Sequence, residues 1–566
     1  EKSDYWGGSH ATIASLQTLR AMTTDTHKAR RERLLEAPPW DLVIVDEAHH
    51  LNLEERNETL GYGLLRSMQD AGCIESMLFF TATPHRGKNF GFFGLLSLLR
   101  PELFDPKKPV DVQLSHLPEV MIRNMKSRVT DLWGNRIFQR PRVSVRDFSY
   151  TPEEDAFYRL LTEFIVGGRA YASTLSSANG QAVNLVLIAL QKLAASSVAA
   201  VRAALRRRVA TLTQELEAGR RALAEKSVLA ASRAVEADGT EDDEAAYDER
   251  LWSDPLRFQL LENELPALQE LLEAAEEVER ESKVTLVEAL LDGELEGRSV
   301  LMFTEYKATQ ALIVSMLRER FGRDEVAFIN GDHALLLPDG EKLSMNRPDA
   351  ADAFNAGAVR LLVSTEAAGE GVDLQESCHT LIHFDVPWNP MRIHQRNGRL
   401  VRYGQEHVVD ILTLRNPDTV EARIWELLEN KMKAIERALD EVTDDPEDLM
   451  EIVLGMSPRK EIEQVFHGAV GKSRERLSEY FDAHQGTLGG KDAIDAVRSI
   501  FGSVKGFDFQ EASDRVPKAD LPDLEPFMRR SCMSFSAQMN QTTMAAAMRV
   551  QTTTNTGPVA SALCVH

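Results

Sequence analysis

The chain has 566 residues, and its 43% hydrophobic and 27% charged residues are typical of a folded protein, which excludes a wholly disordered chain. Lys and Arg total 65 against 88 Asp and Glu, so the formal net charge of -23 excludes nucleic-acid binding through overall charge and requires a local basic surface for it. The four cysteines form no CxxC pair and no apolar run reaches about 18 residues, so the sequence predicts a cytoplasmic protein without a disulfide scaffold, a zinc ribbon or a membrane span.

Residues 1–150 alternate short apolar runs with helical stretches, which is typical of a parallel α/β sheet. Two buried strands are predicted in this part: Asp41–Val45, which follows two prolines, and Met77–Thr83, which ends at Pro84. The residues between them are expected to form a loop and a helix. This β-α-β order predicts part of a nucleotide-binding sheet.

The middle of the chain changes character. Residues 151–282 are rich in Ala, Leu, Glu and Arg and predict a helical insertion, either a helical hairpin or a coiled coil. Residues 283–435 return to α/β alternation and predict a second doubly wound sheet. Its five strand candidates are Arg298–Thr304, Glu325–Gly331, Val359–Thr365, His379–Val386 and Val408–Leu414. Residues 436–528 are expected to be helical, and residues 529–566, rich in Met, Thr, Ser and Ala without periodicity, are expected to be disordered.

Two short motifs follow the first two predicted strands. Asp46–His49 reads DEAH, and a carboxylate at the end of a parallel strand can hold Mg²⁺ through water while a second one orients or deprotonates an attacking water. Thr81–Pro84 reads TATP, whose two hydroxyls could relay a hydrogen bond from the metal site to a neighbouring domain. Each motif alone also fits an ordinary solvated turn or strand end. Their occurrence after successive strands favours the catalytic interpretation.

The third set of motifs is the most specific and comprises Ser364–Gln375, Phe384–Pro390 and His394–Gln405. Arg399 and Arg402 in the last of them are expected to lie on one face of a helix. From there they could neutralise charge on a transferring phosphate, an arginine-finger role worth about 10³–10⁵ in rate. The alternative is a solvated basic helix, which the combined motif spacing disfavours.

Taken in order, DEAH, TATP, STEAAGEGVDLQ, DVPWNP and QRNGRLVRYGQ resemble motifs II, III, V and VI of superfamily-two helicases. PWNP followed by QRxGRxxRxGQ is similar to the Swi/Snf-type branch. TATPHRG and EAAGEGVDLQ are similar to the bacterial group around the RNA-polymerase-associated remodeller, and the set also resembles the Swi/Snf-like helicase of the DISARM phage-defence system. The resemblance covers residues 1–435 and implies an α/β fold of two RecA-like lobes, the first of them incomplete.

The resemblance also implies roles for matching residues. In the first lobe, Asp46 would bind Mg²⁺ through water, Glu47 would be the catalytic base, Thr81 and Thr83 would couple hydrolysis of ATP to the nucleic-acid track, and Ser15 would contact a phosphate of that track. The second lobe would contribute Thr365 at a nucleic-acid phosphate, Gly371 and Asp373 facing the nucleotide, Gln395 linking the lobes, and Arg399 and Arg402 as arginine fingers.

The phosphate-binding loop GxxxxGK[ST], which the resemblance requires upstream of DEAH, is absent before Asp46. Gly471–Ser473 reads GKS, but Phe466 stands where the first glycine belongs. We therefore expect an N-terminally truncated chain that does not hydrolyse ATP by itself.

The sequence thus predicts an ATP-dependent translocase or helicase-like motor, with double-stranded DNA as the expected track and no membrane partner. RNA polymerase or a defence complex is a candidate partner, docked on the helical insertion and the C-terminal helices. The alternative is a catalytically inactive module that binds nucleic acid or a partner, and the missing loop favours it.

Overall fold

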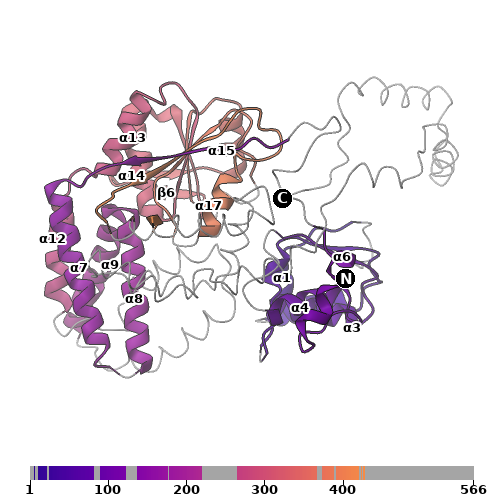
Figure 1. Cartoon of the computed structure of the whole chain (residues 1–566). Coiled ribbons are helices and arrows are strands. Elements are labelled where there is room, and N and C mark those ends of the chain that lie inside the picture. The colour runs from indigo at the N-terminus through magenta and orange to yellow at the C-terminus, as the bar shows by residue number, and fades with distance from the viewer. Residues whose placement is uncertain are drawn as a thin grey trace, which may run out of the picture.

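In the residues described below, the computed structural model contains two parallel sheets, a short antiparallel hairpin and a group of helices (Figure 1). The residues that the structure describes are 6, 11–21, 24–55, 57–81, 89–122, 137–175, 177–218, 264–365, 372–387, 390–419, 422 and 425–426. The expectations for residues 436–528 and 529–566 lie outside the described residues, and so do those for Thr83 and Gly371.

The first described region, residues 11–122, contains a two-stranded parallel sheet. Its strands, β1 (Val43–Val45) and β2 (Met77–Phe79), fall within the two predicted strands. Its helices are α1 (Leu16–Arg20), α2 (Asp25–Leu35), α3 (Leu60–Asp70), α4 (Asn89–Leu99), α5 (Val110–Leu114) and α6 (Leu117–Val120). Apolar residues of α3 recur at helical spacing and pack with Val45 in one core, whereas Ile44 and Leu78 on the other face of the strands are exposed.

The second sheet has six strands in the order β3-β10-β9-β4-β8-β5, and every neighbouring pair is parallel. Their bounds are β3 (Arg142–Asp147), β4 (Val300–Thr304), β5 (Val326–Ile329), β8 (Leu361–Thr365), β9 (Thr380–His383) and β10 (Asp410–Arg415). The five predicted strands are confirmed. Every residue of β4, β5, β8 and β9 is buried, as expected for parallel strands covered on both faces.

The sequence predicted that residues 1–150, and with them Arg142–Asp147, belong to the first sheet. The position of strand β3 shows that this boundary is wrong. All six residues of β3 pair with β10, so the strand belongs to the second sheet. The sequence did not reveal this because β3 lies at the edge of the sheet, where its residues stay partly or fully exposed. Polar residues therefore interrupt Val143 and Val145, and the strand has no continuous apolar run. The hairpin of β6 (Ala334–Leu336) and β7 (Lys342–Ser344) was likewise not predicted.

Helices cover both faces of the second sheet (Figure 1). α13 (Ser282–Asp292) and α14 (Lys307–Phe321) pack on the face that presents Met302 and Phe328. α15 (Arg347–Asn355) packs on the opposite face, which presents Phe303. The predicted fold class, an α/β protein with a doubly wound parallel sheet, is confirmed.

The described part of the segment expected to form a helical insertion contains helices that pack side by side (Figure 1). They are α7 (Pro152–Ala172), α8 (Ser177–Ser196), α9 (Val198–Ala218) and α12 (Glu264–Glu277). Thr151 and Glu154 begin α7 with reciprocal side-chain to backbone hydrogen bonds, a capping box. Ser197 alone separates α8 from α9. None of the helices in the described ranges combines the length and apolar character needed to cross a bilayer.

Candidate active site

The DEAH motif forms a tight turn at the carboxyl end of β1. Asp46 and Glu47 are exposed, and Glu47 adopts the left-handed backbone conformation with φ of 48°. Two contacts fix the turn: the Asp46 carboxylate accepts a hydrogen bond from the Glu47 amide at 2.9 Å, and the Ala48 amide donates to the carbonyl of Phe80 at 2.9 Å. A left-handed residue that is not glycine costs about 1 kcal/mol or more, so surrounding contacts must impose it. The turn therefore presents both carboxylates at the strand end.

His49 joins the DEAH motif to the TATP motif. Its ring is buried, and Nδ1 lies 3.0 Å from Oε2 of Glu47 and 3.1 Å from Oγ1 of Thr81. The expected proximity of Glu47 and Thr81 is thus mediated by a residue that sequence reasoning had left without a role. The sequence does indicate that the two side chains are close, because His49 follows Glu47 by two residues within the DEAH motif.

Asp46 suits a magnesium ion that is also held by phosphates. Mg²⁺ usually keeps several waters and takes one or two protein carboxylates together with substrate phosphate oxygens, and the exposed carboxylate of Asp46 provides such a ligand. Among the described residues, no group of three or more His, Cys, Asp and Glu could hold a metal ion by protein ligands alone.

Arg399 and Arg402 do not lie on a helix, which corrects the prediction of a shared helical face. α17 (Pro390–Asn397) ends one residue before Gly398, because Asn and Gly are poor helix formers. Both arginines lie on the irregular turns that follow, where the Arg399 amide donates to the carbonyl of Arg396 at 3.1 Å. Both side chains remain partly accessible.

Two residues expected to face the nucleotide contact each other, since Arg402 forms an ion pair with Asp373. The other expected residues are placed separately. Ser15 is exposed at the start of α1 and accepts a hydrogen bond from the Thr18 amide, Thr365 is buried at the carboxyl end of β8, and Gln395 lies half-buried on α17.

Residues not foreseen from the sequence hold α17 in place. Arg396 is buried and donates to the backbone carbonyl of Asp385 at 2.7 Å and to its Oδ1 at 3.3 Å. The Arg396 guanidinium also lies 5.7 Å from the ring centre of Phe303, a cation–π contact. One turn earlier, Arg392 pairs with Glu305 at 3.3 Å. The only signal in the sequence is the spacing of four residues between Arg392 and Arg396, which places both on one helix face.

His383 ties strand β9 to the end of α17. Burial lowers the pKa of His383 to about 3, so the imidazole is neutral at physiological pH. Its Nε2 lies 3.0 Å from Oδ1 of Asn397. Because an amide oxygen only accepts, Nε2 carries the proton and donates it. This bond fixes the residue from which the turns bearing Arg399 begin.

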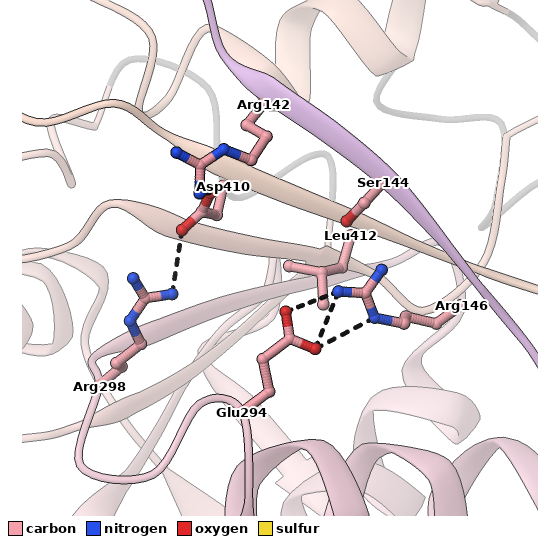
Figure 2. A pocket seen from close by; sticks show the side chains of 7 residues that line it. All are labelled: Arg142, Ser144, Arg146, Glu294, Arg298, Asp410 and Leu412. Atoms are coloured by element: carbon pink, nitrogen blue, oxygen red, sulfur yellow. Dashed lines mark hydrogen bonds and ion pairs between the residues drawn. The ribbon is translucent and has the colours of Figure 1, made fainter.

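A pocket of about 360 Å³ opens beside β3 and β10, away from these motifs (Figure 2). Its lining includes three arginines and two acidic residues. Figure 2 shows Arg146 paired with Glu294, and Arg298 paired with Asp410. Arg142 also lies 3.2 Å from Asp410. The acidic partners offset most of the arginine charge, and none of the predicted site residues lies in the pocket.

Known helicases are similar to much of the chain. Residues 282–404 match the helicase conserved C-terminal domain, and this stretch contains β4, β5, β8 and β9 of the second sheet but not β3 or β10. The chain is 28% identical over 458 residues to the uncharacterized ATP-dependent helicase YqhH of Bacillus subtilis (strain 168), a match covering 78% of this chain and 66% of that protein. It is 25% identical over 412 residues to the RNA polymerase-associated protein RapA of Proteus mirabilis (strain HI4320), covering 68% of this chain and 36% of the relative.

Two solved structures are also similar to the chain. The Pyrococcus furiosus Hef helicase domain matches with 15% identity and a TM-score of 0.36, covering 70% of this chain and 76% of that one. The Sulfolobus solfataricus SWI2/SNF2 ATPase core in complex with dsDNA matches with 16% identity and a TM-score of 0.31, covering 80% and 75%. The family match and the two sequence relatives support a helicase-type ATPase.

Proposed function

We propose that the chain acts as an ATP-dependent motor on nucleic acid, with duplex DNA as its track. ATP would bind between the DEAH turn of the first region and the arginine-bearing turns of the second. The observation that carries the proposal is the contact of His49 with both Glu47 and Thr81. It links the expected base of hydrolysis to a residue expected to transmit the reaction to the track.

The first region would prepare the attacking water. Glu47, held in its orientation by His49, would accept a proton from that water, and Asp46 would hold Mg²⁺ through water. The metal, when bound, neutralises charge on the phosphates. His49 would transmit a change at Glu47 to the Thr81 hydroxyl 3.1 Å away.

The second region would stabilise the charge that develops on the transferring phosphate. Arg399 and Arg402 are both on short turns after α17, and Arg402 is held by Asp373. A nucleotide phosphate carries more charge than one carboxylate and would compete for Arg402. The loss of such an arginine typically lowers the rate by about 10³–10⁵.

The track would be held mainly through its phosphates, with Ser15 and Thr365 among the contacts. Binding of that kind tolerates any sequence and weakens as salt rises. Because the chain carries a net charge of -23, the contact surface must be local. The relative RapA is named as RNA polymerase-associated, which makes RNA polymerase one candidate partner. A defence complex is the second candidate, and it rests on the motif resemblance to the DISARM helicase.

ATP turnover with and without duplex DNA tests the proposal. Because no GxxxxGK[ST] loop precedes Asp46, we expect turnover only when the chain is extended by a segment that supplies this loop. In that extended protein, Glu47→Gln and Arg399→Ala should each lower DNA-stimulated turnover by about a factor of 10³. Glu75→Gln and Arg159→Ala alter exposed residues outside the motifs and serve as matched controls. If neither form of the protein turns over ATP, the chain is a binding module and the motor proposal is wrong.

A further inference from the structure

A buried chain of hydroxyl groups connects the helical insertion to Asp385, which follows β9. The Ser196 hydroxyl donates to Oδ2 of Asp385 at 2.5 Å, and the Thr304 hydroxyl donates to the same oxygen at 2.6 Å. Thr309 lies 2.8 Å from Ser196 and 2.6 Å from Ser197 through their hydroxyl oxygens. All five residues are buried.

The hydroxyl hydrogens in this chain have a defined direction. A serine or threonine hydroxyl has one hydrogen to donate, and that of Ser196 goes to Asp385. Ser196 therefore accepts from Thr309, and Thr309 accepts from Ser197. The chain of donors runs from Ser197 at the junction of the helices to the carboxylate of Asp385, where charge-assisted hydrogen bonds are the strongest.

The same aspartate holds the helix that leads to the proposed fingers. Arg396 donates to the backbone carbonyl and to Oδ1 of Asp385, so the two sides of one residue serve the insertion and α17. The carbonyl of Arg396 in turn accepts from the Arg399 amide. Only Asn397 and Gly398 thus separate Arg396, a member of the buried network, from the first proposed finger.

The junction between α8 and α9 is itself clamped by the start of α13. The Glu281 carboxylate accepts from the amides of Val198 at 3.1 Å and Ala199 at 2.8 Å, the first residues of α9. Lys283 Nζ donates to the carbonyls of Ala195 at 2.7 Å and Ser196 at 2.9 Å, the last residues of α8. These bonds satisfy amides at the start of α9 and carbonyls at the end of α8 that the helices themselves leave without partners. The junction therefore moves only together with the second sheet and its helices.

We propose that Ser196 and Asp385 are positioning residues through which the helical insertion sets the orientation of α17 and of the turns bearing Arg399 and Arg402. The proposal rests on the proposed motor function and adds a route of regulation to it. A macromolecule that binds the helical insertion and shifts or immobilises it would then change the rate of ATP hydrolysis without contacting the nucleotide. Within the described residues, Ser196 supplies the insertion's direct hydrogen bond to Asp385.

Ser196→Ala tests the proposal in the full chain extended by the phosphate-binding loop. We expect amide hydrogen exchange in peptides covering residues 396–402 to quicken by about tenfold, the effect of losing one hydrogen bond to a charged group. Turnover should fall by a similar factor while the KM for ATP stays within about twofold, because the fingers act on the transition state. Thr309→Val keeps the side-chain shape and breaks the chain one link earlier, so it replaces Ser196→Ala if that variant does not fold.

Two controls separate positioning from simple stabilisation. Ser377→Ala removes one hydrogen bond, to the carbonyl of Phe354 at 2.6 Å, and should leave exchange at 396–402 unchanged. Ser197→Ala loosens the junction, and its effect at 396–402 should be smaller than that of Ser196→Ala. Unchanged exchange at 396–402 in Ser196→Ala, or faster exchange with unchanged turnover, would overturn the proposal. Faster exchange in a protein whose wild type never hydrolyses ATP would support the positioning contact while refuting the motor function.

Discussion

Two isoleucines, Ile44 in β1 and Ile382 in β9, both lie inside parallel strands. Ile44 is nevertheless 58% exposed, whereas Ile382 is fully buried. β9 lies inside a six-stranded sheet with helices on both faces, whereas among the described residues β1 pairs with β2 alone and has a core on one face. Both segments read as apolar runs in the sequence. Burial is thus decided by what covers a strand, which a local run of residues does not report.

The residues of the two halves of the proposed site are held in correspondingly different ways. In the first region, the exposed Glu47 contacts the buried side chain of His49. In the second region, Asp385 and Arg396 are themselves buried and share several hydrogen bonds. We infer that the first half can respond locally, while a change in the second half must propagate through a packed network.

The ion pairs of the two regions provide the largest expected difference in stability. Arg208 and Glu264 pair at 1% and 4% side-chain exposure between α9 and α12, whereas Arg66 and Glu58 pair in the first region at 51% and 32%. Arg208→Met leaves a buried carboxylate without its charge partner and should lower the free energy of unfolding by about 3–5 kcal/mol. Arg66→Met should lower it by less than about 1 kcal/mol. Urea unfolding followed by circular dichroism measures the loss of unfolding free energy in each variant. Equal losses would show that burial does not make the Arg208–Glu264 pair more important for stability than the Arg66–Glu58 pair.

The next effect is a pH dependence centred on the clamp at the helical junction. Burial raises the pKa of Glu281 from about 4.5 to about 7, with a smaller contribution from the nearby Glu154, although amide hydrogen bonds and Lys283 oppose the shift. The folded state therefore binds a proton more tightly than the unfolded state. The contribution of Glu281 is fully favourable below about pH 4.5 and is lost as pH rises to about 7, a change of about 3 kcal/mol.

Glu281→Gln removes this titration while keeping an oxygen acceptor. The unfolding free energy of the wild type, minus that of the variant, should therefore fall across this pH interval. Urea titrations at its two ends measure the change. A constant difference would show that the buried carboxylate does not hold its proton more tightly than the unfolded chain does.

Much of the second sheet was predictable because its strands are continuous apolar runs between helices. β3 was missed because an edge strand with alternating Arg and Val does not present such a run. The expected helical face for Arg399 and Arg402 was wrong because α17 ends before Gly398. Periodicity supports a helix, but it does not fix the residue at which the helix stops.

The candidate site was predictable where motif order carried the information and not where distant side chains meet. Asp46, Glu47 and Thr81 follow their strands as expected, and the structure adds His49 between two of them. The contact of Ser196 with Asp385 joins residues 189 positions apart. A pattern of residue types indicates local structure only. The residues around Ser196 and those around Asp385 therefore do not indicate that the two side chains meet.

The smallest predicted effect returns to the two isoleucines. Ile382→Val removes one methyl group from a packed core and should lower the free energy of unfolding by about 1 kcal/mol, while Ile44→Val should change it by less than about 0.5 kcal/mol because the side chain already meets solvent. Hydrogen exchange in peptides from β9 and from β1 measures each region separately. Both variants replace Ile by Val and introduce no polar group. The difference between their losses of unfolding free energy therefore reports only the difference in burial. A loss at Ile44 equal to that at Ile382 would mean that β1 is covered in solution, and the first region would then be as tightly packed as the second.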